Sequence, residues 1–323
     1  MIGHLFFHAP CFDGIASAVL AADFLGHQEW ATIHLHPANY DLKPTWLATP
    51  LPQPCAIVDF LFHPAATFWA DHHPTTFLDD AAHRQYMDRS ADRRLVYDVQ
   101  AGSCAGLLWR HLQTAFGHRN EQFEELVRWA EKIDAARYES VDEVFRAESP
   151  AIQINAALNF SPNPKALCLE LAVELKTRSL AEIANRPDIR RFSEQAIARQ
   201  RQGLELFARS ARLTDDGIVI FDADDPTGFV NRYSPFHFYP DARYSAGIVR
   251  QRQGAKITAM RNPWREFPCA HLGRLCEPLG GGGHLRVGSI ALSAEQCHTA
   301  AEKLDLLLAG IRNFHAGNST THD

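Results

Sequence analysis

The stretch FFHAPCFDGIASAVL, residues 6–20, changes its structural pattern within a few positions. The apolar run HLFFHA predicts a short strand over 4–9, and DGIASAVLAADFLG has the apolar spacing of a helix over 13–26 that stops at a glycine. Between the two patterns stand His8, Cys11 and Asp13, whose side chains can all bind metals. Polar, metal-competent groups are therefore expected where a strand ends and a helix begins.

The same alternation continues through the first half of the chain. Further strands are predicted at 31–37, 55–62 and 67–73, and helices at 103–116 and 121–138. Alternating strands and helices predict an α/β fold with a mainly parallel sheet and helices on both faces. Ligands of such sheets bind beyond the carboxyl ends of the strands. The polar residues expected to converge at that edge are His8, Asp13, Asp59, Asp71, His72 and His73.

The chain length of 323 residues suits two domains, each with its own core. Residues 151–212 look wholly helical, and strand-like segments return after residue 213. We therefore expect a smaller C-terminal α/β domain behind a helical connector. The predicted boundaries are a first domain over 1–190, a connecting helix over 191–212, the second domain over 213–316 and a flexible tail over 317–323.

Composition narrows the function classes. The net charge of -6 gives no general basic field for duplex DNA, so a polyanionic substrate would have to be attracted locally, for example by bound cations. The seven cysteines contain no CxxC pair and fit a disulfide framework poorly, which favours a reducing, cytoplasmic setting. We expect no signal peptide and no membrane span, because no stretch approaches 18 apolar residues.

Mixed carboxylates and imidazoles suit manganese, iron or zinc better than calcium. Two adjacent ions would need a shared carboxylate, and Asp59, alone after its strand, is placed to bridge them. Taken singly, a strand-end aspartate is more often a cap, and Asp134 would pass for a helix surface residue. The order and placement of the whole set favour a metal site.

The run LGGGGHLRVGS, residues 279–289, is the most unusual string in the chain. Consecutive glycines permit positive φ angles and could leave backbone N–H groups free to hold phosphate. A flexible linker is the alternative, but the run lies at a helix-to-strand junction. We therefore predict an anion-binding loop that ends at His284.

Five motifs together resemble the DHH phosphoesterase superfamily, in particular members with a DHH domain and a DHH-associated C-terminal domain, such as nanoRNase-type and RecJ-like enzymes. The resemblance covers nearly the whole chain, and the motifs in series are far more specific than the DHH triplet alone. The matching segments are HxxCxDGxxSA at 8–18, VDF at 58–60, ADHH at 70–73, KIDAARY at 132–138 and GGGGHLRVG at 280–288.

The resemblance implies a role for each matching position. His8 and Asp59 would hold one metal, and the second would be held by Asp13, Asp59, His72 and Asp134. His73 would contact the scissile phosphate, Asp71 would support the cluster, and the small residues Ser17 and 102–106 would lie near the first motif. In the second domain the substrate's non-scissile end would be bound by Arg261, Gly281, Gly282, Gly283 and His284.

Cys11 departs from the family pattern, in which a first aspartate commonly stands two residues before the position of Asp13. A thiolate at this place could ligate a softer ion such as zinc or iron. The other interpretation is that Cys11 is a spectator and the first site is weak.

These inferences predict a phosphoesterase with two divalent cations, manganese in the first place and zinc, iron or magnesium as alternatives. Its substrates would be short single-stranded oligonucleotides, dinucleotides or nucleoside bisphosphates, cleaved by a metal-activated water. Two alternatives stay open: hydrolysis of a phosphoanhydride such as polyphosphate, and a non-catalytic nucleotide-binding module with a degenerate site at Cys11. The sequence also leaves open whether the chain acts alone or as a homodimer.

Overall fold

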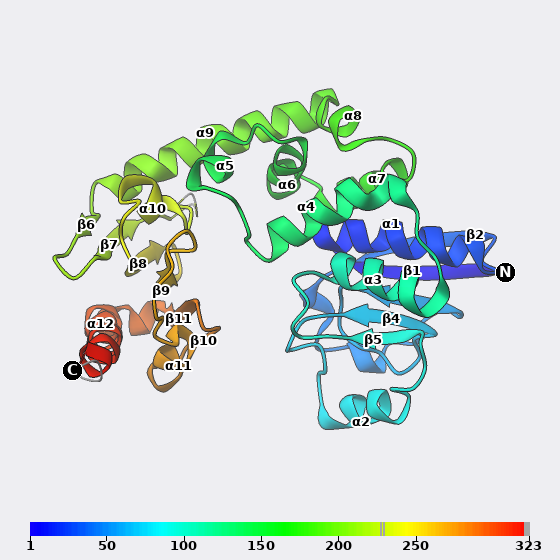
Figure 1. The fold of residues 1–323 in the computed structure, drawn as a ribbon, viewed down its shortest axis with the longest axis horizontal. Coiled ribbons are helices and arrows are strands. Elements are labelled where there is room, and N and C mark those ends of the chain that lie inside the picture. The colour runs from blue at the N-terminus through cyan, green and yellow to red at the C-terminus, as the bar shows by residue number, and fades with distance from the viewer. Residues whose placement is uncertain (227, 229, 320–323) are drawn as a thin grey trace. The chain divides into compact units, whose positions relative to one another are not determined.

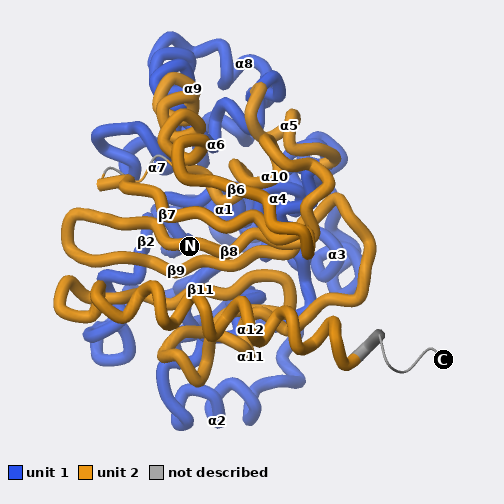
Figure 2. The backbone as a smooth tube through the Cα atoms, turned by 90° about the vertical axis from the view of Figure 1, so that its left-hand side faces the viewer, with its two compact units in different colours: residues 1–138, 147–196 blue, residues 139–146, 197–323 orange. Residues whose placement is uncertain are grey.

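The computed structural model describes residues 1–226, 228 and 230–319. The chain divides into two compact units (Figure 2). The N-terminal unit comprises residues 1–138 and 147–196, and the C-terminal unit comprises 139–146 and 197–323. Within the described ranges, no helix is long and apolar enough to cross a membrane.

The observed division differs from the predicted boundaries in two places. Most of the predicted connector lies in α9 (Pro187–Ala208), which begins and ends four residues earlier than predicted; the first part of this helix belongs to the N-terminal unit and the remainder to the C-terminal unit. The short helix α5 (Val141–Arg146) belongs to the C-terminal unit, where it packs against α10 (Ser234–Phe238). The rings of Phe145 and His237 lie 5.1 Å apart in that contact, a pairing that the local sequence does not reveal.

The N-terminal unit is built on a five-stranded sheet in the order β2-β1-β3-β4-β5, with every neighbouring pair parallel. Figure 1 labels β1, β2, β4 and β5 of this sheet, with α2 (Asp80–Asp88) on the opposite side of it from α1 (Phe12–His27). The order reverses at β1, whose two neighbours are β2 and β3. The carboxyl ends of β1 and β3 therefore form the switch point at which ligands bind in sheets of this kind. The strands are β1 (Ile2–His8), β2 (Thr32–Ala38), β3 (Cys55–Val58), β4 (Phe68–Asp71) and β5 (Leu95–Tyr97).

Helices cover the faces of this sheet unequally. Leu5, Phe7 and Val58 point into the larger core, which they share with α1 (Phe12–His27), α3 (Cys104–Phe116) and α4 (Glu124–Asp134). The same core includes residues of α6 (Pro150–Phe160), α7 (Pro164–Glu174) and α8 (Leu180–Ala184). On the other face, Ile57 and Trp69 pack with α2 (Asp80–Asp88), Trp46 and Phe60–Phe62. The predicted α/β class is confirmed, with one face covered largely by irregular segments.

The C-terminal unit contains a mixed six-stranded sheet in the order β10-β11-β9-β8-β7-β6. Only β7 and β8 pair in parallel among its described strands. Helices α11 (Leu272–Cys276) and α12 (Ala300–Ser319) pack on one core with its strands. The strands are β6 (Arg212–Leu213), β7 (Ile218–Asp224), β8 (Tyr244–Gln251), β9 (Gly254–Arg261), β10 (Gly282–Gly283) and β11 (Val287–Ser293).

Several predicted element ends were wrong. The strand predicted over 55–62 ends at Val58, because Asp59 has a φ of 54°, which no regular strand adopts. The helical segment after residue 164 is interrupted, and α8 begins at a new capping box formed by Ser179 and Glu182. Helix α12 continues to Ser319 across the start of the predicted tail, and 320–323 lie outside the described residues.

Candidate metal centre

Asp59 and His8 lie at the switch point, one after β3 and the other at the end of β1. The left-handed backbone of Asp59 is rare for a residue other than glycine and costs about 1–3 kcal/mol in such positions, which makes it a marker of function. Its N–H donates to the carbonyl of Ala70 (2.9 Å), which holds the turn in place. One of its carboxylate oxygens, Oδ2, lies 3.5 Å from Nδ1 of His8.

Asp13 is held in the first turn of α1 by the start of another helix. Its two carboxylate oxygens accept the N–H groups of Cys104 (2.7 Å) and Ala105 (2.9 Å), the first residues of α3. A helix N-terminus favours such a negative charge. Gly14 permits the arrangement, since a Cβ there would lie 2.0 Å from the carbonyl oxygen of His8. The small residues predicted near the first motif, 102–106, thus hold Asp13.

His72 connects the carboxylates of the predicted second metal site. Its Nδ1 donates to the carbonyl of Ala101 (3.1 Å), which fixes the tautomer and leaves Nε2 with its lone pair. That nitrogen lies 3.7 Å from Asp13 Oδ2, 3.7 Å from Asp59 Oδ1 and 3.3 Å from Asp134 Oδ2. Ligands about 2.0–2.2 Å from a shared ion lie roughly 3–3.6 Å from one another. Asp13, His72 and Asp134 each place one ligand atom within 4.8 Å of the others, so these three groups form a donor set for one cation, and Asp59 lies next to this set, 3.7 Å from His72.

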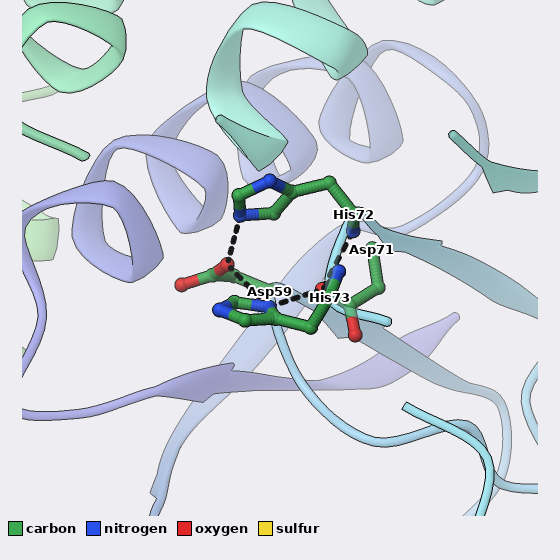
Figure 3. A group of neighbouring side chains, drawn as sticks. All are labelled: Asp59, Asp71, His72 and His73. Carbon is green, nitrogen blue, oxygen red and sulfur yellow. Dashed lines mark hydrogen bonds and ion pairs between the residues drawn. The ribbon is translucent and has the colours of Figure 1, made fainter. Parts of the chain in front are cut away.

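Asp71 lies beside the two histidines and orients them (Figure 3). Its Oδ1 accepts the backbone N–H of His72 (2.7 Å) and Nδ1 of His73 (2.8 Å). The buried hydroxyl of Thr76 donates to its Oδ2. Because Nδ1 of His73 is occupied, its Nε2 remains for a ligand. His73 Nδ1 also lies 3.7 Å from Asp59, so both histidines flank that carboxylate (Figure 3).

Cys11 stands at the N-cap of α1 and makes no side-chain capping bond. Cys11, His8 and Asp59 each place one ligand atom within 4.8 Å of the others, which is a donor set for a single ion. This position lies beside the first predicted metal site and supports Cys11 as a ligand.

Four atoms of the cluster are buried without a hydrogen-bond partner among the described residues: His8 Nδ1, both carboxylate oxygens of Asp59, and His72 Nε2. A buried polar group without a partner costs about 1–3 kcal/mol, and a buried charge costs more. Cations would satisfy all four atoms and offset the clustered negative charge. The residues therefore fit a divalent-metal centre.

The acid groups of the cluster resist ionisation without cations. Burial and the charge of Asp134 raise the pKa of Asp13 from 3.8 to about 6. Burial and the carboxylates of Asp13, Asp71 and Asp134 raise the pKa of Asp59 well above its ordinary value. Burial also raises the pKa of the Cys11 thiol, and the carboxylates of Asp59 and Asp13 add to the effect. A bound cation would reverse these shifts.

The histidines of the cluster shift in opposite directions. Burial, with His73 nearby, lowers the pKa of His8 to about 4, so its imidazole is neutral and able to ligate near pH 7. Burial also acts to lower the pKa of His73, but the hydrogen bond and charge of Asp71 outweigh it, and the pKa is raised. His73 is therefore the better proton donor of the two.

In the C-terminal unit, the glycine run forms a hairpin rather than an open loop. Gly282 and Gly283 pair with Ser289 and Gly288 across β10 and β11. The N–H of Gly281 donates to the carbonyl of Cys276 (2.9 Å), and that of His284 donates to the carbonyl of Val287 (2.8 Å). The prediction that the run leaves its N–H groups free for an anion was wrong at these two residues.

Arg261 and His284 contrast in exposure. The Arg261 side chain is 3% exposed, and its guanidinium lies 3.2 Å from Glu266 Oε2 and 4.6 Å from the centre of the Phe267 ring. His284 has an exposed side chain. Arg261 thus already binds groups of its own loop, whereas His284 is accessible to a ligand.

Sequence reasoning missed two residues at the centre. Thr76 anchors Asp71, and nothing in the sequence distinguishes it from the neighbouring Thr75. The ring of Tyr40 lies 4.9 Å from that of His8, and burial with the charges of Asp59 and Asp71 raises its pKa. Its place just beyond the end of β2, next to β1, was the available signal.

No family model matches the sequence, and no curated protein is similar enough in sequence to be matched. Solved structures do match, and they show the fold: the chain has the two-domain fold seen in DHH phosphoesterases. It is similar to the pGpG-specific phosphodiesterase PggH from Vibrio cholerae, with 17% identity, a TM-score of 0.71, and 96% of this chain and 99% of that chain covered.

Two further structures share the fold. RecJ from Thermus thermophilus in complex with Mn²⁺ has 11% identity and a TM-score of 0.52, over 96% of this chain and 52% of that chain. An exopolyphosphatase-related protein from Bacteroides fragilis has 13% identity and a TM-score of 0.52, over 97% and 92% of the two chains. The same Thermus protein has also been solved with Mg²⁺.

Proposed function

We propose that this chain is a divalent-metal-dependent phosphodiesterase that hydrolyses short linear nucleotides, dinucleotides in particular. The observation that carries the proposal is the convergence of Asp13, Asp59 and Asp134 on Nε2 of His72. These residues come from helices α1 and α4 and from the ends of β3 and β4, and buried atoms of Asp59 and His72 lack partners among the described residues. Such an arrangement is costly unless cations bind there.

The chain offers two donor sets that share Asp59. His8, Cys11 and Asp59 would hold one ion, and Asp13, Asp59, His72 and Asp134 would hold the other. The mixture of oxygen and nitrogen donors suits Mn²⁺, while the Cys11 thiolate would also suit Zn²⁺ or Fe²⁺. Cations bound there would make hydroxide available near neutral pH and offset charge on the phosphoryl oxygens.

His73 would donate a hydrogen bond to the scissile phosphate from Nε2. Asp71 fixes the ring through Nδ1 and raises the His73 pKa, which favours the protonated imidazolium, whose Nε2–H can donate. Thr76 holds Asp71 from the opposite oxygen. Thr76 therefore positions Asp71, and Asp71 positions His73, so that the hydrogen-bond donor is oriented before substrate binds.

Two considerations favour a short substrate. The net charge of -6 provides no general attraction for long polyanions. The similarity to a pGpG-specific phosphodiesterase extends over both whole chains, whereas RecJ is matched over about half its length. We propose His284, beside Gly282 and Gly283, as the residue that binds the substrate's non-scissile end; Arg261 and Gly281 would contribute only by exchanging their present contacts with Glu266 and Cys276. All seven cysteines are free, which supports a cytoplasmic setting.

Phosphoanhydride hydrolysis is a second candidate, supported by the fold shared with an exopolyphosphatase-related protein. A non-catalytic nucleotide-binding module is a third. The three are separated by turnover of a panel with Mn²⁺: a linear dinucleotide, a cyclic dinucleotide, a five-nucleotide RNA, a nucleoside bisphosphate and polyphosphate.

We expect the linear dinucleotide to be cleaved fastest. Asp59→Asn should abolish cleavage, while Asp41→Asn, at a surface ion pair with Lys165, should leave it unchanged. Preferred cleavage of polyphosphate would support the second candidate instead. Failure of every substrate, with Mn²⁺ bound, would support a non-catalytic module.

A further inference from the structure

A second group of metal-competent side chains lies at the opposite end of α1 from the candidate centre. Asp23 and His27 occupy the last turns of α1, and His118 follows the C-cap of α3 at Gly117. A carboxylate oxygen of Asp23 and one ring nitrogen of each histidine all lie within 4.8 Å of one another. We propose that these three residues form a separate binding site for a divalent transition-metal ion, best suited to Zn²⁺.

The group has the supporting contacts expected around metal ligands. Nδ1 of His27 donates to the carbonyl of Asp23 (2.8 Å), which leaves its Nε2 with a lone pair. The side chain of Asn120 donates to Asp23 Oδ1 (3.2 Å), which orients the carboxylate and presents Oδ2 to His118. Ligating histidines and carboxylates are commonly held by such outer hydrogen bonds.

The two inner groups of the site are already in direct contact. Nε2 of His118 lies 2.8 Å from Asp23 Oδ2, a hydrogen-bond distance, and the two atoms would move apart to roughly 3–3.6 Å to share an ion at about 2.0–2.2 Å. Without metal this contact is a hydrogen bond, so an ion would displace the Nε2 proton of His118. Binding must therefore compete with that bond and should release a proton.

The surroundings would keep the inner groups partly dry while leaving a position open to water. The side chains of Asp23 and His118 are 13% and 18% exposed, whereas His27 is exposed. The ring of Phe24 lies 5.4 Å from that of His118. A small cavity of about 10 Å³ is lined by Asp23, His118 and Asn120 among others, which is about the space one bound water needs.

This site is distinct from the candidate metal centre. Asp13 and Asp23 are ten residues apart on the same helix, which corresponds to about 15 Å along its axis. An ion there would fasten the end of α1 to the segment that follows α3. Two imidazoles and one carboxylate favour Zn²⁺ over Mg²⁺ or Ca²⁺.

The test compares two exposed histidines with matching local contacts. His27 bonds the carbonyl four residues before it at 2.8 Å, and His298 bonds that of Glu295 at 2.7 Å. The native chain, His27→Ala and His298→Ala are stripped of metal, loaded with Zn²⁺ in the presence of excess Mg²⁺, and assayed for bound zinc by elemental analysis. Thermal unfolding with and without Zn²⁺ is measured in parallel.

We expect His27→Ala to bind one zinc ion fewer than the native chain and His298→Ala to bind the same number. The metal-free His27→Ala protein should unfold at the native temperature but lose part of the zinc-dependent rise. Equal zinc content in the native chain and His27→Ala would overturn the proposal. Phosphodiesterase turnover with Mn²⁺ should survive in His27→Ala, so this outcome does not depend on the proposed function.

Discussion

The two predicted functional regions differ in how their polar groups are satisfied. At the candidate metal centre, His8, Asp59 and His72 carry buried atoms that lack hydrogen-bond partners among the described residues. In the glycine hairpin, the N–H groups of Gly281 and His284 are already bonded to backbone carbonyls. Both regions looked like binding sites from their residue types. The first region has polar atoms whose hydrogen bonds a ligand would complete, whereas these two N–H groups of the second region do not need a ligand.

We interpret the candidate metal centre as a site that binds a ligand and the glycine hairpin as a motif that allows close packing. A Cβ on Gly273 would lie 2.3 Å from the carbonyl oxygen of Gly283, and one on Gly288 would lie 2.6 Å from the sulfur of Cys276. The glycines thus let α11 approach the hairpin closely. The hairpin's role in binding then rests on the side chain that it displays, His284.

The largest expected effect comes from Asp59→Asn. Asparagine tolerates the left-handed backbone and keeps the shape, so the substitution removes mainly charge. We expect turnover with Mn²⁺ to fall by more than about 10³-fold, beyond the loss typical of one electrostatic group. The metal-free variant should be more stable than the native chain, because a buried carboxylate without a partner has been removed.

Steady-state kinetics and chemical denaturation in EDTA check the two halves of this prediction. Asp41→Asn is the matched control, since Asp41 lies in an exposed pair with Lys165. A variant that loses activity and stability together would show that Asp59 acts in folding rather than in metal binding.

Metal affinity should depend steeply on pH. Asp13, with a pKa of about 6, must lose its proton to bind a cation, as must Asp59, whose pKa is also raised, whereas His8, with a pKa of about 4, is already neutral. We expect the Mn²⁺ dissociation constant to rise about tenfold per unit of pH decrease below about pH 6 for each proton released. Calorimetric titration at several pH values measures it.

In the metal-free protein, rising pH should lower the free energy of unfolding, whereas it strengthens metal binding. Asp59 and His73 have raised folded-state pKa values, so the folded state can keep protons there that the unfolded chain releases. His8 acts in the opposite direction, because its folded-state pKa is lowered from 6.5 to about 4, but above about pH 7.5 its imidazole is neutral in both states. The folded state then binds more protons than the unfolded state, so the free energy of unfolding falls as pH rises. Denaturation in EDTA between about pH 7.5 and 9 should show this decline, and Mn²⁺ should remove it. A flat profile would contradict the raised pKa of Asp59.

Thr76→Val tests the support of Asp71. The hydroxyl of Thr76 donates to Asp71, which in turn holds His73. Loss of such an outer contact typically costs about 10–100-fold in activity, and we expect the loss in kcat with little change in KM. Thr67→Val is the control, because its hydroxyl bonds only the carbonyl of Cys55 in the described contacts. Equal kinetics in the two variants would exclude a positioning role for Thr76.

The residues of the candidate centre were easier to predict from the sequence than the contacts that hold them in place. His8, Asp59 and His72 could be placed because parallel strands end at one edge, a rule that needs only the strand order along the chain. The bond from Cys104 to Asp13 joins residues 91 apart, and neither local spacing nor residue type indicates it. The hairpin was misread for a similar reason: the partners of the glycine N–H groups are decided by tertiary packing.

The substitutions Gly283→Ala and Gly282→Ala test whether the glycines of the hairpin are needed for packing. Gly283 has a φ of 143°, and a Cβ there would lie 2.3 Å from the carbonyl oxygen of Val287. A Cβ on Gly282 meets nothing within 4 Å. We expect Gly283→Ala to destabilise the protein by roughly 1–3 kcal/mol and Gly282→Ala to be nearly neutral. Denaturant titration distinguishes them, and equal stability would refute the packing role of the run.

The smallest structural effect is expected from His284→Ala, which bears on what the hairpin displays. Its side chain is exposed, so the free energy of unfolding should change by less than about 0.5 kcal/mol. If His284 binds the substrate's non-scissile end, KM for a dinucleotide should rise several-fold while kcat is kept, because a contact far from the reacting bond contributes equally in the ground and transition states. His298→Ala, another exposed histidine of the same unit, should leave KM unchanged. An unchanged KM in His284→Ala would leave the hairpin with packing as its role and place substrate recognition elsewhere in the chain.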